Sequence, residues 1–209
     1  RRYELDGKRF ADAGPRTVQF EFAAAGYEVR VVEPVADLDA RLDVLVDDPR
    51  LTEPVRGLLG TRRLALWTDK LNLKRPGIGS AFGWHQDAPY WIHDRDTVGA
   101  LPNVMVALDD ADRGNGCFAV IRGSHRGGCL SGRDDGTQLG GFYTEPARFD
   151  EADAVRLEVP AGSLVFFDPF IVHGSGPNGS PRPRRALVLT YQAGDGPALK
   201  TRRPRPVRD

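Results

Sequence analysis

The sequence predicts a mainly β fold, a sandwich, jelly roll or barrel, with a few helices near its N-terminal end. From residue 61 onward, short apolar runs alternate with clusters of glycine, proline, asparagine and aspartate, which is the pattern of antiparallel strands joined by turns. No helical spacing interrupts these runs, which argues against a parallel α/β sheet. At 209 residues the chain is long enough for one domain with its own core, so we expect residues 1–209 to form a single domain.

Residues 1–60 are predicted to be a mostly helical flank. In the run VADLDARLDVLV the apolar residues recur at the spacing of one helical face, at Val35, Leu38, Leu42 and Leu45. Asp37 is a candidate cap for this helix. A second helix is expected in LTEPVRGLLG, where Thr52 can cap the start, Pro54 suits the first turn and Gly60 can end the helix.

Residues 61–193 are predicted to hold the strands of the core. The eight candidate strands are RLALW, KLNLK, NVMVALD, CFAVIRG, AVRLEV, SLVFF, FIVHG and RALVLTYQ. A glycine-rich connection over residues 126–154 is long for a compact domain, which makes it a candidate lid over a binding site. Residues 194–209 form a basic, proline-containing tail that we expect to be disordered or draped over the surface.

The composition excludes several classes of partner. Lys plus Arg and Asp plus Glu both number 29, so no net charge favours nucleic acid or an anionic membrane. No apolar run approaches the ~20 residues that span a bilayer, and residues 1–15 lack the apolar core of a signal peptide. The two cysteines, Cys117 and Cys129, form no disulfide framework. These features predict a cytoplasmic protein that acts on a small molecule.

The stretch GWHQDAPYW places His85 and Asp87 two residues apart. If GWHQD is extended, both side chains emerge on one face, with Gln86 turned away. Two histidines and one carboxylate on one triangular face suit Fe(II) in oxygen-activating enzymes. A pair of this kind is common by chance, so its meaning depends on a second histidine.

Three other histidines compete for that position. His173 ends the apolar run SLVFFDPFIVHG and is followed by Gly-Ser-Gly, as expected of a polar group at the rim of a core. His125, in RGSHRGG, suits a surface turn. His93 lies only eight residues beyond His85 and is more suited to the mouth of a site.

Four segments between Asn72 and Arg185 resemble the phytanoyl-CoA dioxygenase family of Fe(II)- and 2-oxoglutarate-dependent oxygenases. They are LNLKRPGIGSAFGWHQDAPYW, VALDDADRGNGCFAVIRGSH, PAGSLVFFDPFIVHGSGPN and PRPRRALVLTYQ. The resemblance implies a double-stranded β-helix, the cupin-like jelly roll, and it implies His85, Asp87 and His173 as the iron ligands.

The same resemblance implies a binding site for the 2-oxoglutarate cosubstrate. A buried carboxylate needs a cation, and the family spacing places it eleven residues after the distal histidine, at Arg184. Arg185 is the competitor, since neighbours on a strand face opposite ways. Ser175 would assist at the same carboxylate. Asn72 and Lys74 would add polar contacts, or else belong to a solvated strand face.

The implied reaction uses Fe(II), 2-oxoglutarate and dioxygen, with ascorbate as the reductant in vitro, to hydroxylate an unactivated C–H bond of a small molecule. Tyr90, Trp91 and His93 follow the metal-binding strand and are expected to border the substrate. The chain has many arginines and only four lysines, a composition that suggests a high-GC bacterial source. Oxygenases of the resembled kind often modify natural products in such bacteria, so we expect a natural-product intermediate as substrate. Two alternatives are epimerisation, desaturation or cyclisation at the same iron centre, and a non-catalytic jelly roll that binds metal or sugar.

Overall fold

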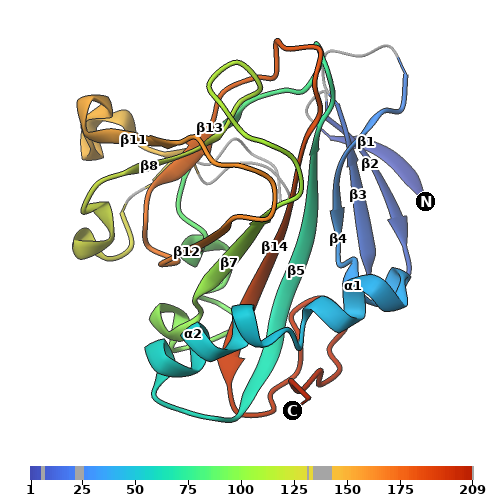
Figure 1. Ribbon diagram of the computed structural model, residues 1–209, viewed down its shortest axis with the longest axis vertical. Coiled ribbons are helices and arrows are strands. Elements are labelled where there is room, and N and C mark those ends of the chain that lie inside the picture. Colours follow the sequence, from blue (N-terminus) through green and yellow to red (C-terminus); the bar gives the residue numbers. More distant parts are fainter. Residues whose placement is uncertain (6–7, 22–25, 131, 134–142, 209) are drawn as a thin grey trace.

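The computed structural model describes residues 1–5, 8–21, 26–130, 132–133 and 143–208, and its core is a pair of facing antiparallel β-sheets (Figure 1). The larger sheet has the strand order β1-β2-β3-β4-β5-β14-β7-β12. Its strands are β1 (Arg2–Leu5), β2 (Lys8–Ala13), β3 (Arg16–Phe20), β4 (Val29–Glu33), β5 (Leu64–Lys74), β7 (Asn103–Ala107), β12 (Leu164–Phe167) and β14 (Arg184–Ala193).

The smaller sheet has the order β11-β8-β13-β6-β10-β9. Its strands are β6 (Phe82–His85), β8 (Phe118–Ile121), β9 (Gly132–Arg133), β10 (Tyr143–Thr144), β11 (Ala154–Leu157) and β13 (His173–Ser175). Chain segments distant in sequence thus alternate between two sheets, which is the jelly roll expected for residues 61–193.

Strands β5 and β14 form the longest pairing of the larger sheet, from Arg184 opposite Lys74 to Ala193 opposite Leu64. The predicted strands RLALW and KLNLK are one continuous strand, β5. Because side chains alternate along a strand, β14 buries two faces at once. Ala186 and Val188 pack toward the smaller sheet with Met105 and Phe118, while the residues between them face the helices.

The helices cover the outer face of the larger sheet (Figure 1). They are η1 (Ala36–Leu38), α1 (Ala40–Leu45) and α2 (Pro49–Leu59). The apolar core beneath them consists of Val35, Ala36, Val46, Leu51, Val55, Leu64, Leu66, Val104, Val106, Leu187, Leu189 and Tyr191. Burial of these side chains, at about 25 cal/mol per Å² of apolar surface, holds the helices on the sheet.

The helix limits differ from the prediction in their starting points. Asp39 and not Asp37 caps α1, and Asp48 caps α2 one turn before Thr52. In each case the aspartate carboxylate accepts a hydrogen bond from the backbone N–H two residues later, which satisfies one of the free donors at a helix start. Gly60 ends α2 as predicted, in the left-handed conformation with φ 62°.

The expectation that residues 1–60 are mostly helical is wrong for the first half of that range. The described part of this half contains strands β1 to β4, which extend the larger sheet beyond β5. The runs RTVQF and VRVVE combine β-branched residues with alternating polarity, a strand pattern. Val31 and Val32 then pair with Asn72 and Leu71, so the edge of β5 gives this segment its partner.

The tail is ordered along the surface, so the draped alternative is correct and the disordered one is wrong for residues 194–208. Leu66 N–H donates to Arg205 O at 2.9 Å, and Ala65 forms a bridge with Pro206. Among the described residues, no helix combines the length and the apolar character needed to cross a membrane.

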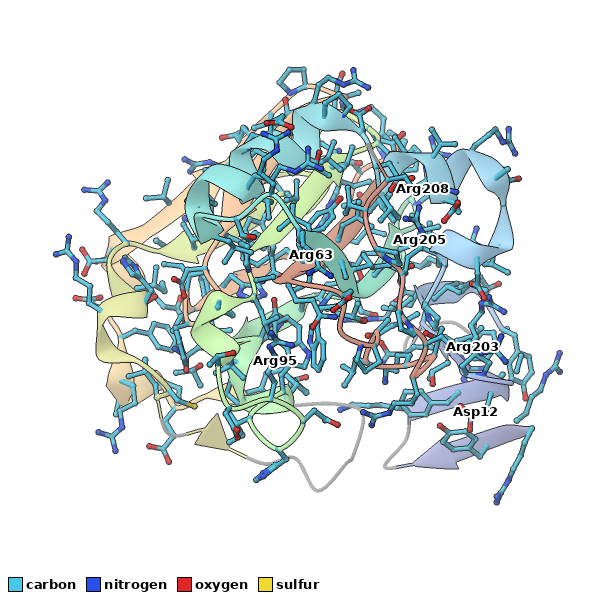
Figure 2. The ribbon with its side chains drawn as sticks, turned by 90° about the horizontal axis from the view of Figure 1, so that it is seen from below. Asp12, Arg63, Arg95, Arg203, Arg205 and Arg208 are labelled. Carbon is cyan, nitrogen blue, oxygen red and sulfur yellow. The ribbon has the colours of Figure 1, made fainter. Side chains whose placement is uncertain are left out.

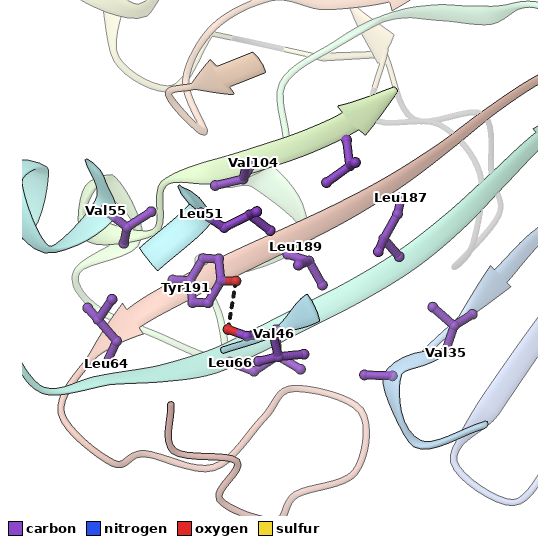
Figure 3. Close-up of a cluster of buried hydrophobic side chains, with 12 residues drawn as sticks. Val35, Val46, Leu51, Val55, Leu64, Leu66, Val104, Leu187, Leu189 and Tyr191 are labelled. Carbon is purple, nitrogen blue, oxygen red and sulfur yellow. Dashed lines mark hydrogen bonds between the residues drawn. The ribbon is translucent and has the colours of Figure 1, made fainter. Parts of the chain in front are cut away.

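Replacing Tyr191 by phenylalanine tests the contact between α1 and the sheet. Tyr191 is fully buried and its hydroxyl donates to Val46 O at 3.0 Å (Figure 3). Tyr191→Phe leaves that carbonyl without its donor, so we expect urea denaturation to give a free energy of unfolding lower by about 1–2 kcal/mol. The control is Tyr3→Phe, whose hydroxyl bonds Asp12 at the surface; a loss there as large as at Tyr191 would contradict the assignment.

Candidate metal centre

Two neighbouring strands of the smaller sheet bring the predicted metal donors together. His173 at the start of β13 lies directly opposite His85 at the end of β6. Asp87 follows two residues later, in a helical turn with φ −78° and ψ −32° and not in an extended strand. The N–H groups of Asp87 and Ala88 both donate to Pro169 O, at 3.1 and 3.0 Å, and this fixes the turn.

The donor atoms of His85, Asp87 and His173 all lie within 4.8 Å of one another. The Nε2 atom of His173 is 3.8 Å from Asp87 Oδ2, and the two imidazole centroids are 4.2 Å apart. In each histidine Nδ1–H donates to a backbone carbonyl, of Gly83 at 2.7 Å and of Ile171 at 3.0 Å. Nε2 of both rings therefore carries a lone pair that can bind a metal.

The Asp87 carboxylate is held from the larger sheet. Its Oδ2 accepts a hydrogen bond from Asn103 Nδ2 at 3.1 Å, and its Oδ1 lies 3.5 Å from Lys70 Nζ. Asn103 Oδ1 in turn accepts from the Thr190 hydroxyl at 2.5 Å. This chain of buried bonds orients the carboxylate in the way that outer partners orient metal ligands.

The protonation states of the three side chains suit a divalent cation. Burial, together with the neighbouring His173, lowers the pKa of His85 to about 3. Burial also lowers the pKa of His173. For Asp87, burial alone would raise the pKa, but Lys70 and the two imidazoles hold it below the usual value. Two neutral imidazoles and one carboxylate with a free face are the donor set that non-haem iron prefers.

A cavity of about 380 Å³ opens onto the three donors. Tyr90 and Trp91 line it, as the sequence predicted for the substrate side. Trp91 is also buried against Trp67 and Leu101, so it belongs to the core as well. The placement of His93 at the mouth is wrong: the chain turns after Trp91, and His93 is exposed and does not line the cavity.

Arg184 lies in the cavity wall and Arg185 lies outside it. The Arg184 side chain is buried, and Nε and Nη2 donate to Gly116 O at 3.0 and 2.6 Å. Burial lowers its pKa to about 10, so the guanidinium stays charged at neutral pH. Arg185 makes a two-pronged contact with Asp109 at the surface. The strand alternation thus distinguishes the two arginines as expected.

Gly116 makes this arrangement possible. It has φ +77°, and a Cβ there would lie 2.3 Å from Gly176 O, so a larger side chain would push apart the turn that holds Arg184 and the segment after His173.

Of the other residues predicted to contact the cosubstrate, two line the cavity and one does not. Ser175 and Asn72 line the cavity. Lys74 does not; its buried Nζ donates to Ser80 O at 2.7 Å and to Gly176 O at 2.5 Å. Lys74 therefore holds the turn beside β13. Its side chain does not line the cavity in which the cosubstrate contact is predicted.

Lys70 and Lys200 line the cavity but are not among the predicted site residues, whereas Tyr143 belongs to the predicted candidate lid. Lys70 lies two residues before Asn72 on β5, and strand alternation could have placed it on the same face. Tyr143 lines the cavity from β10 and lies against Gly83. Lys200 lines the cavity from the tail, and no sequence pattern in the tail indicates that it lies near the site.

The candidate lid over residues 126–154 is described only in part, because residues 131 and 134–142 lie outside the described residues. The described parts contain β9, β10 and the 3-10 turns η5 (Pro146–Arg148) and η6 (Glu151–Asp153). His125, at the entrance to this segment, is exposed, which agrees with its predicted surface position.

Comparisons with known proteins agree with this geometry. The family model described as phytanoyl-CoA dioxygenase (PhyH) matches residues 2–186. The probable alpha-ketoglutarate-dependent hypophosphite dioxygenase of Stutzerimonas stutzeri is 33% identical over 172 residues, which cover 79% of this chain and 57% of that protein. The L-proline trans-4-hydroxylase of Streptomyces griseoviridis is 31% identical over 181 residues, which cover 78% and 67%.

Among solved structures, EctD from S. alaskensis with 2-oxoglutarate and 5-hydroxyectoine superposes with a TM-score of 0.66 and 27% identity, covering 80% of this chain and 57% of that one. The chain spans a little over half to two thirds of the length of these relatives. By its family match, its fold and its donor set, the chain belongs to the phytanoyl-CoA dioxygenase family of Fe(II)- and 2-oxoglutarate-dependent oxygenases.

Proposed function

We propose that this chain is the catalytic domain of an oxygenase that couples 2-oxoglutarate decarboxylation to hydroxylation of an unactivated C–H bond in a small molecule. The observation that carries the proposal is the cluster of His85, Asp87 and His173, with donor atoms within 4.8 Å, beside a cavity that also contains the buried cation Arg184. In this proposal the three clustered residues hold Fe(II) and leave its other positions open.

The cosubstrate lies between the metal and Arg184. Arg184 pairs with Lys74 on β5, while Val188 pairs with Lys70, whose Nζ reaches Asp87. Four residues along a strand span about 13 Å. An arginine side chain and a five-carbon diacid placed end to end can bridge this distance. Arg184 then binds the distal carboxylate, and Ser175 and Asn72 lie along the same wall.

With iron bound, dioxygen and 2-oxoglutarate would yield succinate and carbon dioxide, with the second oxygen atom transferred to the substrate carbon. The chain's own residues hold the open face, keep both imidazoles neutral and line the substrate side with Tyr90 and Trp91. Two of the matched relatives are named for small polar compounds, hypophosphite and L-proline. We propose a small polar substrate here as well, in the biosynthesis of a natural product.

Epimerisation, desaturation or cyclisation would use the same residues, since these reactions differ in the fate of the substrate radical. A jelly roll that only bound metal or sugar would have no use for a charged arginine buried in the same cavity, where the charge is costly unless it meets an anion. Succinate release on addition of Fe(II), 2-oxoglutarate and ascorbate tests the proposal. Absence of both 2-oxoglutarate binding and succinate release in the wild type would refute it.

The two histidines His173 and His125 give a matched pair of variants. His173→Ala removes one of three metal donors, so we expect Fe(II) affinity to fall by more than about 100-fold, since loss of an outer partner alone costs 10- to 100-fold. Succinate release should fall to background. His125→Ala changes an exposed side chain and should leave both quantities within about twofold of wild type. Equal losses in the two variants, measured by iron content and succinate, would overturn the ligand assignment.

Arg184 and Arg185 give a second pair. Arg184→Gln removes a charged partner of the distal carboxylate, so we expect the KM for 2-oxoglutarate to rise by about 10- to 100-fold. Arg185→Gln removes a surface ion pair with Asp109 and should leave that KM unchanged. The measurement is succinate release against 2-oxoglutarate concentration. If Arg185→Gln raised the KM and Arg184→Gln did not, the inward arginine would be misassigned.

A further inference from the structure

The C-terminal tail forms part of the wall of the metal-site cavity. Leu199, Lys200 and Arg202 line this cavity together with the metal donors. The turn is closed on itself, since Arg202 N–H donates to Ala198 O and Ala198 N–H donates to Arg203 O, both at 2.9 Å. Leu199 N–H also donates to Trp67 O at 2.7 Å, which joins the turn to β5. The turn from Leu199 to Arg202 is therefore part of the cavity wall.

The rest of the tail is anchored away from the cavity. Arg205 forms ion pairs with Asp43 and Asp47, and Arg208 pairs with the same two aspartates. Figure 2 shows Arg205 and Arg208 close together beside the pale-blue helical segment, with Arg203 apart from them. This anchor fixes the path of the chain that leads back from the turn.

Two other charged side chains that line the cavity, Arg202 and Glu33, already have partners in the protein. Arg202 Nη2 lies 3.0 Å from Asp94 Oδ1, which ties the tail to the turn after Trp91. Glu33 accepts a hydrogen bond from the Thr68 hydroxyl at 2.9 Å, and its charge acts on Lys70. Lys70 in turn lies 3.5 Å from Asp87 Oδ1 and so has a carboxylate partner of its own.

Lys200 is a cation that lines the cavity and takes no part in these contacts. Its side chain is half-buried, and within the described part of the chain it has no hydrogen-bond or ion-pair partner. A half-buried ammonium facing a cavity is stabilised when an oxyanion enters it. Leu199, the neighbour of Lys200, bonds Trp67 O on β5, whereas Arg184 pairs with Lys74, seven residues further along that strand. The cosubstrate at Arg184 and an anion at Lys200 therefore need not be the same molecule.

We propose that the tail turn is a specificity element of the site and that Lys200 binds an acidic group, a carboxylate or phosphonate, on the substrate. This inference rests on the proposed function, since it needs the cosubstrate to occupy Arg184. Trp91 and Leu199 then contact the apolar part of the substrate, and Lys200 fixes its acidic end.

The test uses the protein loaded with Fe(II) and 2-oxoglutarate without oxygen, so that the metal and Arg184 are already occupied. Acetate and methylphosphonate are titrated by calorimetry at low ionic strength, with acetamide as the uncharged probe. The variants are Lys200→Ala and Lys200→Glu. The matched control is Arg203→Ala, which removes an exposed cation from the same turn that does not line the cavity.

We expect at least one of the two anions to bind the wild type, with affinity about 10-fold lower in Lys200→Ala, lost in Lys200→Glu and unchanged in Arg203→Ala. The tighter probe identifies the acidic group as carboxylate or phosphonate. Binding of neither anion, equal binding of acetamide, or equal loss in Arg203→Ala would overturn the proposal. Loading with 2-oxoglutarate precedes the titration, so a failure of the proposed function appears as failed loading and is distinct from a failure at Lys200.

Discussion

The antiparallel pairing of β5 with β14 is the constraint on which the rest of the structure depends. One strand, β14, presents Leu187, Leu189 and Tyr191 to the helices and Arg184 and Val188 to the cavity. The period of two that governs side chains on a strand makes these assignments inseparable. A shift of register by one residue would expose the apolar set and direct Arg185 inward. The packing of the helices therefore fixes the chemistry of the opposite face.

The site itself combines burial with a small number of compensating charges. Burying a neutral imidazole that is hydrogen-bonded costs little free energy, whereas burying an ionised carboxylate costs much more unless it is paired. Asp87 is therefore the group that needs support, and it receives it from Lys70 and Asn103 on the larger sheet. The predicted metal donors belong to the smaller sheet and its adjoining turn, so the Asp87 carboxylate links the two sheets at this site, in addition to the apolar packing between them.

Much of the core could be predicted from the sequence because its strands are bounded by clear turn residues. The sequence also placed His85, Asp87 and His173 together, and Arg184 inward, by motif spacing and strand alternation; their roles as ligands stay predictions. Strands β1 to β4 pair with one another in sequence order, and only β4 pairs with β5. The runs RTVQF and VRVVE indicate strands, but the joining of these strands to the larger sheet depends on the distant β5, which no local pattern shows.

The two errors at the site, His93 and Lys200, have different origins. His93 was placed by its closeness in sequence to His85, but a turn intervenes, and closeness in sequence says little about direction after a turn. Lys200 was missed for the opposite reason. Lys200 follows β14 by a few residues, and its neighbours Leu199 and Arg202 bond to Trp67 on β5 and to Asp94, which holds the turn at the cavity. The composition of the tail does not indicate either contact.

The opposed residues His85 and His173 lie 88 positions apart in the sequence, and this separation has a consequence for stability if they hold the proposed metal. In the unfolded chain the two side chains are far apart on average, so a divalent cation held by both would bind the folded state almost exclusively. By mass action such a ligand stabilises the fold by RT ln(1 + [L]/Kd), about 2.7 kcal/mol when its free concentration is 100 times Kd. With a metal held at this site, the melting temperature would therefore rise with the free metal concentration of the solution.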